Sequence, residues 1–131
     1  MLKNELHKDR RAFKTAWFTK HADKAGIHDS ELCEAILEMN AGQCDADLGG
    51  NVFKKRLNEN RHRSIVLSKI STYWFFTFLF AKANQENISK EELKGFKKLA
   101  KDYGLQSDED IAKQLASKNL TEICNDCTKK I

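Results

Sequence analysis

A dense cluster of basic residues is the part of this sequence best suited to chemistry. The segment 54–63 holds five basic residues, one histidine and a single acidic residue, Glu59. The basic residues are Lys54, Lys55, Arg56, Arg61 and Arg63. Because such a density of fixed positive charge attracts polyanions, the segment indicates a phosphate-binding surface, and nucleic acid is the first partner to consider.

Two of these cations are expected on one face of a strand. Side chains alternate along a strand, so Lys54 and Arg56 point to one side while Lys55 points to the other. Lys55 joins them only if a β-bulge at Gly49–Gly50 shifts the register. His62 is the one histidine inside the cluster and is a candidate general base. The alternative for His62 is an ordinary surface histidine in a loop.

The elements that must position this cluster form an α+β pattern. Alternating apolar residues predict strands over 13–18, 52–57, 63–70 and 73–82, and the last is apolar on both faces and hence central. Helices are predicted over 19–25, from a cap at Asp29 or Ser30 to Gly42, from Ser89 to Gly104, and from Ser107 onward. The tail from Thr121 is expected to be a short strand or coil. The order β-α-α-β-β-β-α-α predicts a small antiparallel sheet flanked by helices.

The buried side of each predicted helix follows from helical spacing. Residues expected in the core are Leu32, Ala35, Ile36, Met39, Leu93, Phe96, Leu99 or Ala100, Tyr103, Ile111 and Leu115. Three glutamates of the second helix, Glu31, Glu34 and Glu38, are expected to form a solvated acidic side.

Length and composition favour one domain that does not enter a membrane. With 131 residues we expect a single domain over 1–131, with an N-terminal arm over 1–11 and a C-terminal tail over 121–131. The longest apolar run, around 73–81, is shorter than the roughly 20 residues of a membrane span, and the N-terminus lacks an apolar signal core. We therefore expect a cytoplasmic protein.

The cysteines stand at positions 33, 44, 124 and 127. The single C-x-x-C near the C-terminus has no second pair at the spacing of a zinc site. We expect reduced thiols without a role, and a metal or redox role is the alternative.

Several stretches of the sequence resemble the RelE/ParE superfamily of bacterial toxins from type II toxin–antitoxin modules, and its HigB-like branch above all. The stretches are residues 13–18, 32–35, 45–56, 80–84, 88–93 and 97–101, so the similarity covers about 13–123. The most distinctive are ADLGGNVFKKR at 46–56 and FAK at 80–82.

The resemblance implies a toxin that cleaves messenger RNA, often in the ribosomal decoding site, and that a partner antitoxin neutralises. In this chemistry the ribose 2′-hydroxyl attacks the adjacent phosphate without a metal or cofactor, and fixed cations stabilise the charge that builds on the phosphoryl oxygens. The implied partners are messenger RNA, the ribosome and an antitoxin. The antitoxin is expected to be a helix-turn-helix protein whose acidic or apolar segment covers the basic cluster.

Matching positions carry the implied roles residue by residue. Arg63 would stabilise the transition-state charge, and Lys54 and Arg56 would bind phosphate. Lys82 matches the lysine that ends the central strand. The predicted catalytic residues are Arg63, Lys54, Arg56, Lys82 and His62, and the predicted RNA-binding residues are Lys55, Arg61 and Asn84.

The sequence departs from the best-studied ribosome-dependent nucleases of the superfamily at two positions. Ala83 stands where those proteins have an arginine, and Ser89 stands near the position of their tyrosine, where it resembles a helix cap. Two alternatives therefore stay open beside the nuclease. One is a non-enzymatic ParE-like toxin that binds a protein target such as a topoisomerase, and the other is a catalytically decayed RNA-binding domain.

Overall fold

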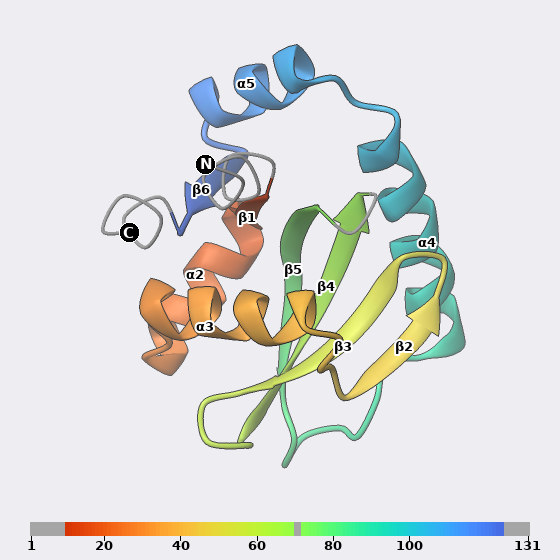
Figure 1. Ribbon diagram of the computed structural model, residues 1–131. Coiled ribbons are helices and arrows are strands. Elements are labelled where there is room, and N and C mark those ends of the chain that lie inside the picture. The colour runs from red at the N-terminus through yellow and green to blue at the C-terminus, as the bar shows by residue number, and fades with distance from the viewer. Residues whose placement is uncertain (1–9, 70–71, 125–131) are drawn as a thin grey trace.

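The computed structural model describes residues 10–69 and 72–124 and is an α+β fold built on one six-stranded sheet (Figure 1). The strands are β1 (Arg11–Thr15), β2 (Ala46–Gly49), β3 (Val52–Leu57), β4 (His62–Lys69), β5 (Tyr73–Ala81) and β6 (Leu120–Ile123). The helices are α2 (Ala16–Ala25), α3 (Asp29–Asn40), α4 (Lys90–Gly104) and α5 (Asp108–Ala116). The predicted class and element order are confirmed, and β2 and β6 are short edge strands that add to that order.

The strand order across the sheet is β2-β3-β4-β5-β1-β6. Strands β2 to β5 are antiparallel neighbours, as the short connections between them predict. β1 lies beside β5 in parallel, and β6 runs antiparallel to β1. The first and last described strands therefore lie side by side, on the opposite half of the sheet from the β2–β3 hairpin (Figure 1).

Helices cover both faces of the sheet. α2 and α3 pack on one face and α4 and α5 on the other, and in Figure 1 α3 and α4 lie on opposite sides of β4 and β5. The α3 face buries Phe18, Leu32, Ile36, Leu57, Val66 and Phe76. The α4 face buries Phe13, Val52, Ile65, Leu67, Phe75 and Tyr103. Because β3, β4 and β5 are covered on both sides, the alternation of side chains decides which helix each residue meets.

Local signals for the two last helices are confirmed. Ser89 accepts a hydrogen bond from the Glu92 N–H at 3.0 Å, and the Glu92 carboxylate accepts from the Ser89 N–H at 2.8 Å. Ser107 and Asp110 form the same reciprocal box at the start of α5. The expected core residues Leu32, Ala35, Ile36, Met39, Ala100, Tyr103 and Ile111 are buried, while Leu93, Phe96, Leu99 and Leu115 are partly buried against that core.

The first strand was predicted too late in the sequence. β1 ends at Thr15, whose hydroxyl accepts a hydrogen bond from the Phe18 N–H at 3.1 Å and caps α2. The capping bond satisfies a free N–H of the first helical turn, so the helix starts at Ala16 and not at residue 19. The predicted strands over 63–70 and 73–82 end at Lys69 and Ala81, and Ile70 lies outside the described residues.

The predicted cap of α3 is also wrong. His28 is the N-cap residue and makes no side-chain capping bond. Asp29, one of the two predicted caps, binds Lys14 instead, with Nζ and Oδ1 2.8 Å apart. Lys14 is buried on β1, and a buried ammonium is costly unless it is paired, so this contact takes precedence over a cap.

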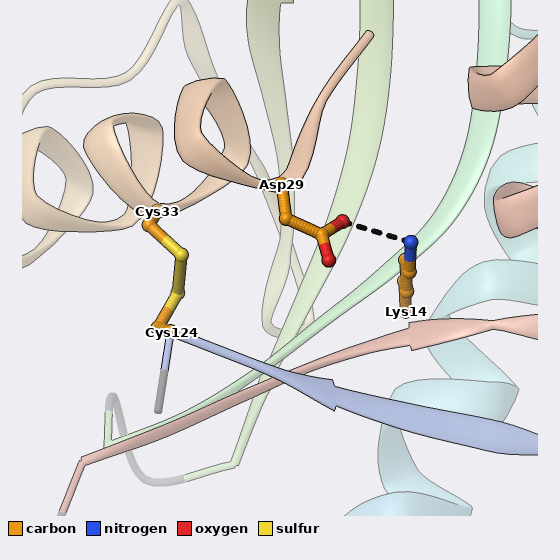
Figure 2. Close-up of a disulfide and its surroundings, with 4 residues drawn as sticks. All are labelled: Lys14, Asp29, Cys33 and Cys124. Carbon is orange, nitrogen blue, oxygen red and sulfur yellow. Dashed lines mark hydrogen bonds and ion pairs between the residues drawn. A yellow bond between two sulfur atoms is a disulfide. The ribbon is translucent and has the colours of Figure 1, made fainter. Parts of the chain in front are cut away.

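A disulfide joins α3 to the end of β6, which corrects the prediction of reduced thiols (Figure 2). Cys33 and Cys124 are 91 residues apart in sequence, and their Cα atoms are 5.3 Å apart. The pairing of β6 with β1 brings Cys124 beneath α3, close to the contact between Lys14 and Asp29. Cys44 is a free thiol among the described residues, burial raises its pKa, and Cys127 lies outside the described residues.

Over residues 10–69 and 72–124, no helix has both the length and the apolar character needed to cross a membrane.

Candidate functional site

Three of the predicted site residues lie together on one face of the β3–β4 pair. Arg56 and Arg63 are directly opposite each other across the two strands, and Lys54 lies two residues before Arg56. Val52 and Ile65, which share this face, are buried in the core formed with α4. Lys54, Arg56 and Arg63 therefore lie on the α4 face, and we call these three residues the basic triad.

One carboxylate holds the two arginines of the basic triad. Asp45 Oδ1 lies 3.1 Å from Arg56 Nε, and Asp45 Oδ2 lies 3.7 Å from Arg63 Nε. The Asp45 N–H donates to the Lys54 carbonyl at 2.9 Å, which fixes the carboxylate beside β3. Like charges directly opposite each other destabilise a strand pair, so Asp45 offsets the repulsion between the two guanidinium groups. Within the described part of the chain, the buried Oδ2 atom of Asp45 has no hydrogen-bond partner.

The two arginines differ in their access to solvent. The Arg63 side chain is 10% exposed, and its Nη1 donates to the carbonyls of Asn60 and His62 at 3.1 and 3.2 Å. The Arg56 side chain is 59% exposed. Arg56 is therefore open to an anion from solvent, whereas Arg63 lies deeper in the site, beside Asp45.

Lys54 completes the basic triad at the border of the loop between β5 and α4. Its ammonium donates to Asn87 Oδ1 at 2.6 Å. α4 reaches the same hairpin through Lys97, whose side chain lies over the Gly49–Gly50 turn. A Cβ at Gly50 would lie 2.8 Å from Lys97 Cγ, and both glycines have positive φ, so the pair is needed for the turn and for the close approach of α4.

Lys55 belongs to the opposite face of the sheet. Its Nζ atom lies 2.6 Å from Glu38 Oε1 of α3, and its side chain is 11% exposed. The β-bulge beside Gly49 lies between β2 and β3 and does not turn Lys55 toward the basic triad. The acidic side of α3 is therefore only partly solvated: Glu38 binds Lys55, Glu31 accepts from the Asn58 N–H, and Glu34 is exposed as predicted.

His62 is also separated from the basic triad. It follows the alternation of β4, so it faces the α3 side together with its cross-strand partner Leu57. Its Nδ1 atom lies 3.1 Å from Asn58 Nδ2. Burial lowers the pKa of His62, and the positive charge of Arg61 lowers it further. The structure thus places the candidate general base on the face that does not carry the triad.

The remaining predicted residues gather where β4 begins and β5 ends. Arg61 lies 3.0 Å from Glu59 and also donates to Asn58. The Lys82 N–H donates to the Arg61 carbonyl at 2.9 Å, which keeps these two cations close. Lys82 and Asn84 are exposed, and the Lys82 ammonium has no hydrogen bond or ion pair with any residue that the structure describes.

A pocket of about 440 Å³ lies beside this group, between α2 and the end of β5. Its walls include Trp17 and His21 of α2, Phe78 and Phe80 of β5, and the predicted site residues His62 and Asn84. Trp17 is 41% exposed, the only described tryptophan with a large exposed surface. We call this the aromatic pocket.

The chemistry of the basic triad is that of an anion site. Lysine and arginine side chains donate to phosphate oxygens, and a paired arginine fork suits phosphate geometry. No group of three or more histidine, cysteine, aspartate or glutamate side chains that could hold a metal ion occurs in residues 10–69 and 72–124. Fixed cations in this arrangement have the chemistry suited to a phosphodiester and to charge that develops on it.

Two residues of the site, Asp45 and Asn87, could not be recognised from the sequence. Asp45 and Asn87 lie in loops or at strand edges, and their partners Arg56, Arg63 and Lys54 are distant in sequence. Several cations in a predicted sheet imply that acceptors lie nearby. Asp45 is identified as an acceptor only by the pairing of β2 with β3, and Asn87 only by the path of the loop after β5.

Comparison with known proteins gives one match. The family model described as the RelE toxin of the RelE/RelB toxin–antitoxin system matches residues 10–123, nearly the whole described chain. Searches of curated proteins and of solved structures gave no match.

Proposed function

We propose that this chain, which belongs to the RelE family of toxins from toxin–antitoxin systems, stops growth by cutting messenger RNA during translation. The HigB-like branch is our assignment within the family, on the stretches 46–56 and 80–82. The substrate would be messenger RNA bound to the ribosome, and the site of action the cytoplasm. The cognate antitoxin would be a helix-turn-helix protein that covers the basic triad with an acidic or apolar segment.

The observation that carries this function is the basic triad with Asp45. Three cations share one sheet face, and the two arginines already contact a carboxylate. A carboxylate resembles a phosphodiester in carrying one negative charge shared between two oxygen atoms. A phosphodiester that displaces Asp45 from Arg56 would meet a preorganised guanidinium with Lys54 beside it. Preorganised donors gain most in a site that excludes water, and Arg63 is already in such surroundings.

The proposed cleavage step would use this placement of the cations. The 2′-hydroxyl oxygen would attack phosphorus and the bond from phosphorus to the 5′-oxygen would break. The 2′-hydroxyl would give its proton to water, and the leaving 5′-oxygen would take one proton from water, so that the products are a 2′,3′-cyclic phosphate and a 5′-hydroxyl. Arg56 and Lys54 would hold the phosphoryl oxygens, and Arg63 would stabilise the added negative charge. Because His62 faces α3, we assign the rate gain to charge stabilisation and positioning and not to His62 as a base.

The experiment compares growth of a bacterial host after induced expression, with primer-extension mapping of a reporter messenger RNA. The variants are Arg56→Ala and Arg63→Ala, with Lys113→Ala on α5 as a control that removes the same charge elsewhere. We expect growth arrest and new RNA ends for the wild type and the control, and roughly 10²- to 10³-fold less cleavage for both arginine variants, the usual cost of one lost transition-state donor.

The other outcomes identify the alternatives. Because Arg63 is buried, its replacement could also unfold the protein. Thermal melting shows whether each variant is folded, and Arg63→Lys keeps the positive charge while it removes the guanidinium group. Growth arrest without new RNA ends would move the assignment to a toxin that binds a protein target. No arrest, together with salt-sensitive RNA binding, would indicate an RNA-binding domain without activity.

A further inference from the structure

The aromatic pocket exists because β1 is shorter than its neighbour. β1 pairs with β5 only as far as Lys14 and Phe76, and the chain then turns into α2 at Ala16. β5 continues to Ala81, so the edge of its second half faces α2 and not another strand. The resulting notch holds about 440 Å³, enough for a flat heterocyclic ring.

Stacked rings form one wall of this pocket. The Trp17 ring lies 3.5 Å from the His21 ring at an interplanar angle of 14°, and 4.9 Å from the Phe78 ring at 27°. The His21 Nδ1 donates to the Trp17 carbonyl at 2.8 Å, which fixes the imidazole in this stack and leaves Nε2 for another partner. Because Trp17 remains 41% exposed, this stack is not explained by core packing alone.

The polar groups of the pocket suit the edge of a base. Asn84 and Gln85 bring amide donors and acceptors from the turn after β5, and His62 adds a ring nitrogen. Lys24 is the cation of the pocket wall, and Lys82 lies just outside it. Among the described lining residues none is acidic, so the pocket favours a ligand that carries negative charge.

The pocket and the basic triad are linked through the sheet. Arg56 is the cross-strand partner of Arg63, and Arg63 is the cross-strand partner of Phe80, which lines the pocket. Neighbouring strands are about 4.8 Å apart, so Arg56 and Phe80 are roughly 10 Å apart along this row. A short single-stranded segment spans such a distance with a phosphate at one end and a base at the other.

We propose that the aromatic pocket binds a nucleobase of single-stranded RNA whose neighbouring phosphate is held by the basic triad. The base would pack against the exposed part of the Trp17–His21 stack, and Asn84 and Gln85 would contact its edge, so that the pocket sets the base preference of cleavage. The inference rests on the proposed function for its ligand. Aromatic stacking of this kind is the usual means of holding single-stranded nucleic acid.

The first test observes Trp17 directly in the full, disulfide-bonded chain labelled with ¹⁵N. The chain has two tryptophans, so it has two indole N–H signals. Trp74 is 3% exposed and donates to Asn40 at 2.9 Å, which makes its signal an internal control. The four nucleoside 3′-monophosphates are titrated one at a time, with ribose 5-phosphate as the probe without a base.

We expect the nucleotides to shift the Trp17 indole signal in a saturable way, and ribose 5-phosphate to leave it unchanged. Affinity, read from backbone signals near Asn84, should fall roughly 5- to 150-fold in Trp17→Ala, the equivalent of about 1–3 kcal/mol for a stacked base. Trp17→Phe should retain most of the affinity. Leu37→Ala, an exposed apolar residue of α3, is the control and should bind as the wild type does.

The second test separates this inference from the proposed function. If nucleotides shift the Trp17 signal but the protein cuts no RNA, the pocket inference stands and the nuclease assignment fails. If the protein cuts RNA while Trp17→Ala cuts at the same positions and rate, the pocket inference is overturned and the nuclease remains. A Trp17 signal that no nucleotide moves, or that ribose 5-phosphate moves equally, also overturns the pocket inference.

Discussion

The two faces of β3 use neighbouring cations in different ways. On the α3 face Lys55 has an acid of its own, Glu38, and Glu31 binds the backbone just after the strand. On the α4 face Arg56 and Arg63 share the single carboxylate of Asp45. One run of basic residues is thus divided by strand alternation into a part that fastens a helix and a part with excess positive charge.

This difference bears on the anion site that we propose. The α3 face is already neutralised by the glutamates of the helix, and a phosphate there would meet negative charge. The α4 face has three cations, of which two arginines share the carboxylate of Asp45, and among the described residues the Lys54 ammonium contacts the neutral amide of Asn87. A polyanion therefore gains more on the α4 face, even though Lys55 lies between Lys54 and Arg56 in sequence.

The two faces are also held together differently. α3 is joined to β6 by the bond between Cys33 and Cys124 and by ion pairs to β1 and β3. α4 packs on its face through apolar side chains such as Phe96, Ala100 and Tyr103. The α3 face is thus held by a covalent bond and ion pairs in addition to apolar packing. Variants that remove one of these interactions at a time test the contrast between the two faces.

Removal of the disulfide should have the largest effect. A cross-link over a loop of about 100 residues restricts the unfolded chain by about 4 to 5 kcal/mol in the chain-entropy model. Cys33→Ser should lower the free energy of unfolding by up to this amount, measured by urea denaturation. Reduced wild-type protein is the matched comparison and should resemble the variant, because both chains lack the cross-link. Equal stability of the oxidised and reduced chains would contradict a structural role for the bond.

Loss of one carboxylate from each face should have an intermediate and unequal effect. Asp45→Asn leaves the buried Arg63 without its ion-pair partner, so we expect a loss of about 1–3 kcal/mol in unfolding free energy. Lys55 is as buried as Arg63, but Glu38 is 44% exposed and Asp45 only 15%, so in Glu38→Gln water can reach the ammonium and less than about 1 kcal/mol is expected. The two variants are compared by urea denaturation at one pH and salt concentration. Equal losses would mean that the faces do not differ in this way.

Acid should produce the smallest effect, on the α3 face. Because the pKa of His62 is lowered in the folded protein, the unfolded chain binds this proton more readily. His62 therefore makes its full contribution to the free energy of unfolding at a pH above the ordinary histidine pKa of about 6.5. This contribution is lost as the pH falls from there through the pKa of His62 in the folded protein. Thermal melting between pH 7.5 and pH 5.5 measures it. His62→Gln should show a weaker dependence on pH over this range, and an unchanged dependence would exclude His62 as the source.

Local parts of the fold could be predicted because their causes lie within a few residues. The capping boxes at Ser89 and Ser107 and the alternation of β3 and β4 depend on neighbours in sequence. Where two local signals compete, prediction failed: alternation extended the first strand past Thr15, while the capping hydroxyl of Thr15 started a helix. The placement of Lys54 with Arg56, and of Lys55 away from them, followed from alternation alone.

The sequence by itself determined the helical and strand periods, the dense positive charge and the residues that share each strand face. The tertiary structure alone decided that Asp45 lies between Arg56 and Arg63, that His62 faces α3, and that β1 ends early enough to leave the aromatic pocket. It also decided the bond between Cys33 and Cys124, across 91 residues. The reason is physical: periodicity and capping act over one or two turns, whereas these contacts depend on how the sheet brings distant strands side by side.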